Sequence, residues 1–291
     1  MQVAHRSRTN GSSRRRSQAS TEAPTFPEGD VPTTTGTARL ERDPDRPRAF
    51  TVVVNDVPSS YVDLDDPGFL AFEYMQQMAA LVDLLDGPLE AVHLGAAGCA
   101  LPRYIDHTRR GSRQLGVDVD AVLMERVREW FDLPRSPRLR LRAGDARAAV
   151  ATLRDGSADL VVRDVFDGAT TPPHLTTVEA TDDVLRVLRD DGIYLVNCAD
   201  RPPLAGLASE LATLRAAGLS DEHVAVVAEP ALFKRRRYGN FVVAASRVHT
   251  FDDAALGRAL RTQPVPAHLV TGPGLEALRG TAAPRHDDPG P

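Results

Sequence analysis

Residues 91–98, with the sequence AVHLGAAG, constrain the fold of this chain more than any other stretch. An apolar run ends in a turn of small residues, and the segment ALPRYIDHTRR that follows is typical of a helix. Asp118 lies in the stretch GVDVD, 23 residues after Gly95. A strand, a Gly/Ala turn, a helix and an acid that closes the next strand form a nucleotide-binding half-unit. The sequence therefore predicts a site for a small molecule that contains adenosine.

From Leu89 onward, short apolar segments alternate with helical patterns. Strands are predicted over 91–95, 113–118, 138–142, 159–164, 192–198, 222–228 and 239–246, and helices near 99–109, 120–132, 146–153, 175–190 and 203–217. Apolar strands that are spaced by helices indicate a parallel sheet covered on both faces. The last two strands are joined only by ALFKRRR, which is too short for the crossover helix that parallel neighbours need. The final strand is therefore predicted to be antiparallel.

The predicted fold class is α/β, with a Rossmann-like, mostly parallel seven-stranded sheet and a late antiparallel strand. This arrangement resembles the class I S-adenosylmethionine-dependent methyltransferase fold. A small N-terminal β-hairpin piece precedes it, with strand-like AFTVVVND and VPSSYVDLDD around a turn. The predicted organisation is a disordered arm over 1–36, a hairpin and linking helix over 37–88, the Rossmann-like nucleoside- and sulfonium-binding domain over 89–250, and a C-terminal helix and disordered tail over 251–291.

Composition narrows the classes of protein that remain. The 42% hydrophobic content suits a globular core, no apolar run approaches the length of a membrane span, and no secretory signal is evident. Cys99 and Cys198 form neither a disulfide framework nor a metal-binding spacing. A net charge of −5 argues against bulk nucleic-acid binding. We expect a cytoplasmic protein with no metal, no nucleic-acid partner and no membrane contact.

The first candidate site consists of the turn and the acid after the next strand. Gly95, Ala96, Ala97 and Gly98 would let the methionine part of a sulfonium cofactor lie against the backbone. The alternative is a tight strand-to-helix connection without a ligand. Asp118 is the predicted ribose ligand, with a turn residue at a strand end as the alternative. The turn lacks the third glycine of a G-x-G-x-x-G fingerprint, which disfavours NAD.

Two further segments end predicted strands at the same edge of the sheet. In GDAR, Asp145 would accept a hydrogen bond from the adenine amino group and Ala146 N–H would meet a ring nitrogen, although Asp145 is also an ordinary helix N-cap. In DLVVRDVFDG, Asp164 and Asp167 would pair with an amine and help remove its proton, with turn capping as the alternative. His174 follows a Gly/Thr/Pro loop that could form a lid, and it is interpreted as structural.

At these residues the chain resembles the spermidine synthase (polyamine aminopropyltransferase) family, over roughly residues 50–246. GAAGCALPRYI is similar to the family's cofactor loop, GVDVD to the region of its ribose-binding acid, GDAR to its adenine-contacting segment and DLVVRDVFDG to the stretch with its two active-site aspartates. The resemblance implies decarboxylated S-adenosylmethionine as donor, an amine acceptor, and an N-terminal hairpin that covers the amine site and supports homodimers. Gly98 stands where the family's loop has an aspartate that helps hold the aminopropyl amine.

The leading functional hypothesis is therefore group transfer from an adenosyl sulfonium donor to an amine, in polyamine biosynthesis. Methyl transfer from intact S-adenosylmethionine uses the same fold and is the first alternative. A catalytically degenerate relative without enzymatic activity is the second alternative, and an NAD-dependent oxidoreductase is a weaker one.

Overall fold

The computed structural model describes residues 26–251 and 253–288. Its strands are β1 (Val31–Pro32), β2 (Thr37–Arg42), β3 (Ala49–Val54), β4 (Val57–Asp63), β5 (Glu90–Leu94), β6 (Arg113–Asp118), β7 (Leu139–Ala143), β8 (Ala158–Arg163), β9 (Leu188–Asp200), β10 (Val224–Ala228), β11 (Gly239–Ser246) and β12 (His268–Val270). Its α-helices are α1 (Glu73–Val82), α2 (Ala100–Thr108), α3 (Ala121–Phe131), α4 (Ala146–Ala151), α5 (Val178–Val187), α6 (Ala205–Ala216), α7 (Pro230–Phe233), α8 (Ala254–Arg261) and α9 (Pro273–Arg279). No helix in these two ranges is long and apolar enough to cross a membrane.

The main sheet has the strand order β12-β10-β11-β9-β8-β5-β6-β7. The five strands from β9 to β7 are parallel, and β11 runs antiparallel to both β9 and β10. The mostly parallel α/β fold and its late antiparallel strand are therefore confirmed. The structure adds an eighth strand, β12, which pairs with β10 and was not predicted because it contains only three residues. The strand order reverses between β5 and β8, and ligands bind at such switch points in open α/β sheets.

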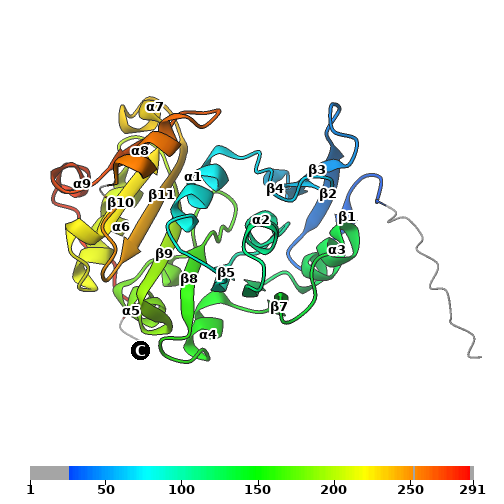
Figure 1. Ribbon diagram of the computed structural model, residues 1–291, viewed down its shortest axis with the longest axis horizontal. Helices are drawn as coiled ribbons and strands as arrows, with labels where there is room; N and C mark the ends of the chain where they lie inside the picture. The colour runs from blue at the N-terminus through cyan, green and yellow to red at the C-terminus, as the bar shows by residue number, and fades with distance from the viewer. Residues whose placement is uncertain (1–25, 252, 289–291) are drawn as a thin grey trace, which may run out of the picture.

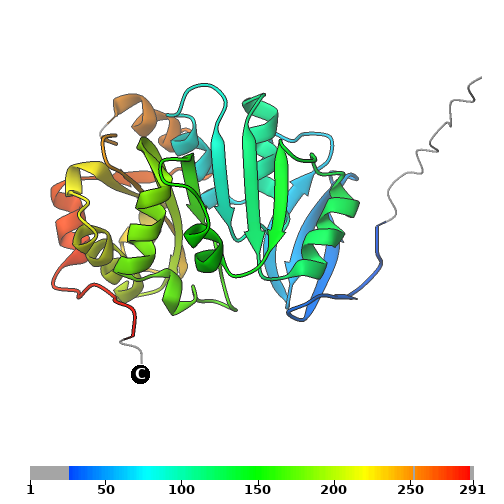
Figure 2. The same cartoon turned by 90° about the horizontal axis from the view of Figure 1, so that it is seen from below.

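Helices cover both faces of the main sheet. Because successive side chains of a strand point to opposite faces, each strand contributes to the hydrophobic core on either side. Tyr194 and Val196 of β9 pack with α4, α5, α6 and α9, whereas Ile193 and Leu195 of the same strand pack with α1, α2 and α8. Figure 1 shows α8 and α9 at one end of the molecule and β1–β4 with α3 at the other. Figure 2 shows the strands of the main sheet side by side from below.

The N-terminal piece is a four-stranded antiparallel sheet with the order β1-β2-β3-β4. The predicted hairpin is its β3-β4 part, and Asn55 and Asp56 form the tight turn with φ values of +49° and +65°. Positive φ at both turn residues matches the right-handed twist of the strands, which explains why Asn and Asp occupy them. Phe50 packs with Phe131 of α3, with ring centroids 6.4 Å apart, so this sheet is attached to the main domain.

Both predicted disordered ends are partly ordered. Residues 1–25 of the predicted arm lie outside the described residues, but β1 pairs with β2, and Thr34 N and Thr35 N donate to Asp120. At the other end, β12 and α9 follow α8, and residues 283–288 lie against α5 and α6. Polar and Pro-rich composition predicted disorder at both ends, but backbone hydrogen bonds to distant residues hold these segments in place.

Candidate functional site

The loop after β5 meets the end of β8 at the switch point of the sheet. Gly95 has φ +83° and donates its N–H to Val117 O at 2.9 Å, while Asp164 N donates to Leu94 O at 2.8 Å. A Cβ on Gly95 would lie 2.0 Å from Asp164 O. Only glycine fits this position, because it accepts the positive φ and leaves room for the neighbouring backbone. The glycine therefore brings the predicted cofactor loop against the first predicted active-site aspartate.

Asp118 ends β6 and organises this loop through its carboxylate. Its Oδ2 accepts hydrogen bonds from Ala96 N and Ala97 N, each at 3.1 Å, and its Oδ1 accepts one from Asp120 N at 3.0 Å. A carboxylate oxygen has two lone-pair sites, so one site remains open on Oδ1. Asp118 thus lies beside the loop, and its Oδ1 accepts one hydrogen bond from the described residues, which leaves one lone pair for a ligand.

Gly98 faces the N-terminal sheet. A Cβ on Gly98 would lie 2.6 Å from Ser60 Cβ and 2.9 Å from Ser60 Oγ, and Ser60 is a buried residue of β4. The close approach of β4 leaves no space for a side chain at position 98. The aspartate that the family resemblance places here is therefore excluded by packing.

Asp145 performs the role of an N-cap and also contacts His174. Its Oδ1 accepts the N–H of Ala148 at 2.8 Å, and its Oδ2 lies 2.8 Å from His174 Nε2. Burial raises the pKa of Asp145, but these two hydrogen bonds together outweigh burial, so the pKa lies below its usual value. The carboxylate is consequently ionised at neutral pH.

Asp164 follows β8 and is held by two side chains from other elements. Its Oδ1 accepts Asn197 Nδ2 of β9 at 2.9 Å, and its Oδ2 accepts Tyr74 OH of α1 at 3.2 Å. Burial raises the pKa of Asp164 to about 6, although both hydrogen bonds act in the opposite direction. Such a carboxylate is mostly ionised at neutral pH and is a stronger base than an exposed one.

Asp167 lies in the loop between β8 and α5 and has an exposed side chain. Its backbone N–H donates to Thr170 O at 2.8 Å, which closes a short turn that contains Gly168 and Ala169. Within residues 26–251 and 253–288, no contact joins the carboxylates of Asp164 and Asp167, and no group of His, Cys, Asp or Glu could hold a metal ion. The two aspartates share one loop, but only Asp164 is fixed by other side chains.

Sequence reasoning missed two residues of this arrangement and gave His174 only a structural role. Asn197 is an amide inside the apolar strand segment YLVNCA, and a polar residue in a buried strand is itself a signal of function. Tyr74 lies in an amphipathic helix, where a tyrosine at a core position carries no such signal. Its link to Asp164 depends on how α1 packs over the sheet.

A separate cavity of about 730 Å³ lies between α2, the end of α3 and the N-terminal sheet. None of the predicted site residues lines it. Arg103 at its edge donates to Phe131 O and Asp63 O, so this arginine joins three parts of the fold. Its lining includes neither the loop over residues 95–98 nor Asp118, Asp145, Asp164 or Asp167.

The structure is similar to that of a probable spermidine synthase from Corynebacterium glutamicum. The TM-score is 0.84 and the identity 36%, over 91% of this chain and 98% of that chain. A spermidine synthase in complex with the transition state analogue AdoDATO shares the fold, with a TM-score of 0.58 and 13% identity over 80% of this chain and 78% of that chain.

Curated relatives match a shorter part of the chain. The polyamine aminopropyltransferase of Chromobacterium violaceum is 29% identical over 139 residues, which are 47% of this chain and 53% of that protein. The match thus spans about half the length of this relative. No protein-family model matches the chain.

Proposed function

This chain belongs to the spermidine synthase family, and from that premise we propose that it is an aminopropyltransferase of polyamine biosynthesis. The donor is decarboxylated S-adenosylmethionine, and the acceptor is a small amine. The observation that carries the proposal is the placement of Asp164. This carboxylate lies at the switch point, against the Gly95 loop, with both oxygens held by Tyr74 and Asn197.

The donor's adenosine would occupy the edge of the sheet beyond β5, β6 and β7. Asp118 Oδ1 has one free acceptor site for a ribose hydroxyl, and a second hydroxyl would have to replace a loop N–H on Oδ2. Ala146 N–H belongs to the first turn of α4, where backbone donors have no partner within the helix. An adenine amino group would share Asp145 Oδ2 with His174.

The transfer itself is a direct displacement. The neutral amine nitrogen attacks the aminopropyl carbon bonded to the sulfonium, a C–N bond forms, and the C–S bond breaks with its electron pair going to sulfur. The products are methylthioadenosine and an alkylated ammonium, whose proton passes to the Asp164 carboxylate. Because the donor is already activated, alignment of the two reactants supplies most of the rate enhancement.

Recognition of the donor's aminopropyl ammonium has to differ from the family pattern, because Gly98 offers no carboxylate. Asp167, predicted from the sequence to pair with an amine, is the residue that we propose for this ammonium, and its loop leads from Asp164 toward His174. An exposed carboxylate binds an ammonium weakly until a ligand or a lid excludes water. We therefore expect the loop over residues 165–173 to close over the bound donor.

The test is an assay of the purified protein with decarboxylated donor and a series of diamines. Formation of methylthioadenosine supports the proposal, and Asp164→Asn should reduce kcat by about 100-fold or more. Asp167→Asn should mainly raise the donor KM. Formation of S-adenosylhomocysteine from intact S-adenosylmethionine would instead identify a methyltransferase. Absence of both products, together with no binding of either donor, would identify a catalytically degenerate relative.

We also propose that the protein acts as a homodimer in the cytoplasm. Among the described residues, β4 is an edge strand of the N-terminal sheet with exposed residues at its start, and edge strands associate readily with another chain. Both cysteines are free and buried, which suits a reducing compartment. Light scattering of the purified protein tests the dimer, and a monomer at micromolar concentration would contradict it.

A further inference from the structure

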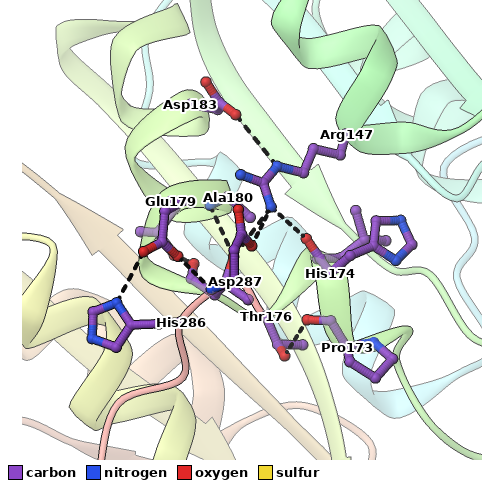
Figure 3. Close-up of polar contacts among 12 residues, drawn as sticks. Arg147, Pro173, His174, Thr176, Glu179, Ala180, Asp183, His286 and Asp287 are labelled. Atoms are coloured by element: carbon purple, nitrogen blue, oxygen red, sulfur yellow. Dashed lines mark hydrogen bonds and ion pairs between the residues drawn. The ribbon is translucent and has the colours of Figure 1, made fainter. Parts of the chain in front are cut away.

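Arg147, the second residue of α4, lies at the centre of a polar network beside the adenine side of the proposed site (Figure 3). Its Nη1 donates to Asp287 Oδ1 at 2.6 Å, to His174 O at 3.2 Å and to Thr177 Oγ1 at 3.3 Å. Its Nε lies 3.5 Å from Asp183 Oδ2, and the side chain is 22% exposed. One guanidinium thus contacts α5, the end of the β8–α5 loop and the C-terminal segment.

The C-terminal segment, residues 283–288, is anchored before it reaches Arg147. Ala283 O accepts from Ser209 Oγ and Arg285 N donates to Thr213 Oγ1, which fastens the segment to α6 at 3.0 Å in both cases. Arg285 O then accepts Val178 N at 2.8 Å, at the start of α5.

Glu179 fixes the next two residues of the segment. Its Oε1 lies 2.9 Å from His286 Nδ1, and its Oε2 accepts Asp287 N at 2.9 Å (Figure 3). These contacts orient the Asp287 carboxylate toward Arg147. The hydrogen bond from Arg147 holds the pKa of Asp287 below its usual value, so the pair is ionised at neutral pH.

His174 connects this network to the proposed adenine site. Its carbonyl accepts from Arg147, while its ring lies on Asp145 Oδ2, the oxygen that an adenine amino group would share. Arg147 therefore holds the backbone of His174, and Asp145 holds its ring. Any shift of Arg147 changes where the β8–α5 loop ends and how His174 meets Asp145.

We propose that Arg147 is a positioning residue for donor binding, and that residues 283–288 act as a brace that holds it through Asp287. The brace keeps His174 and the end of the β8–α5 loop against Asp145, and so sets the affinity for the adenosine part of the donor. This inference rests on the proposed function. Arg147 has no contact with Asp164 among the described residues and is assigned no chemical step.

The experiment compares Asp287→Asn and Arg147→Met with the parent protein, and uses Asp288→Asn as the matched control. Asp288 is the adjacent exposed aspartate, and its carboxylate contacts no side chain of the described residues. We expect the Kd for methylthioadenosine and the donor KM to rise about 5- to 20-fold in both variants. At saturating donor, kcat should stay within about twofold, because the lost contacts act equally on ground state and transition state. Asp287→Glu should restore most of the affinity.

A second measurement separates this inference from the proposed function. Hydrogen exchange of residues 165–177 in ligand-free protein should be faster in Asp287→Asn than in Asp288→Asn, whether or not the protein is an aminopropyltransferase. Unchanged Kd and unchanged exchange in a folded Asp287→Asn variant would overturn the brace. Faster exchange in a protein that binds no adenosyl ligand would keep the brace and reject the proposed function. A fall in kcat with unchanged KM would reject a positioning role.

Discussion

At the scale of single residues, the pKa of Asp164 sets the pH dependence of the proposed reaction. The carboxylate must be ionised to accept the amine proton, so kcat/KM should fall as the pH drops below about 6. Tyr74 OH stabilises the ionised form of Asp164. Its removal in Tyr74→Phe should shift the acid limb of the pH profile of kcat/KM upward by about one pH unit. A pH profile of kcat/KM at saturating amine measures the shift.

Tyr104→Phe is the control for this substitution, since Tyr104 OH bonds to Asp83 and not to any predicted site residue. It should leave the profile in place. A limb that does not move in Tyr74→Phe would show that Asp164 is not the titrating group.

The ionised carboxylate of Asp164 also lowers the free energy of unfolding of the protein. Because burial raises the pKa of Asp164 from 3.8 to about 6, the free energy of unfolding falls as the pH rises between these values and stays lowered above them. Asp164→Asn should therefore stabilise the protein by about 1–2 kcal/mol at pH 8 and by nothing measurable at pH 3.5, while it reduces kcat by about 100-fold or more. Urea unfolding at the two pH values tests this, and equal stabilisation at both would contradict it.

At the scale of elements, the connection between β5 and α2 depends on Gly95. Gly95→Ala places a Cβ on a residue with φ +83°, where an L side chain is strained, and this Cβ would lie 2.0 Å from Asp164 O. We expect a loss of about 2–5 kcal/mol in the free energy of unfolding, since the end of β8 has to move. Gly156→Ala is the matched control, with φ +57° and no heavy atom within 4 Å of the added Cβ. It should cost only the strain of about 1–2 kcal/mol.

At the scale of the whole molecule, Asp120 joins the N-terminal sheet to the main domain. Its carboxylate caps α3 through Leu123 N and also accepts Thr34 N, Thr35 N and Thr35 Oγ1. Asp120→Ala should cost about 2–4 kcal/mol in the free energy of unfolding and expose residues 31–63 to limited proteolysis.

The stabilisation by Asp120 also depends on pH. Burial raises the pKa of Asp120, but its hydrogen bonds lower the pKa well below 3.8, so the stabilisation is present above that pH and is lost in stronger acid.

Asp253→Ala is the control for the cap alone, because the Asp253 carboxylate accepts only Ala255 N, at the start of α8, among the residues that the structure describes. It should cost about 1 kcal/mol and leave the proteolysis of the N-terminal sheet unchanged. Equal proteolysis of both variants would mean that Asp120 does not hold the two parts together.

The sequence by itself determined the alternating strands and helices from β5 to β11 and their order. Strand and helix periodicity, the Asn55-Asp56 turn and the short link before β11 are local patterns, and the structure has the turn and the antiparallel β11 as predicted, whereas the predicted helix near 175–190 ends at Val187, where β9 begins at Leu188. The position of Asp118 beside the Gly95 loop followed from the same local logic, since the carboxyl ends of parallel strands share one edge.

Only the tertiary structure decided what surrounds the aspartates. Tyr74 lies 90 positions before Asp164, Asn197 lies 33 after it, and Asp287 lies 140 after Arg147. These contacts depend on how helices and chain ends pack on the sheet, and side-chain periodicity contains no information about which distant faces will meet. The loss of a side chain at Gly98 has the same origin, because β4 occupies the space that a Cβ would need.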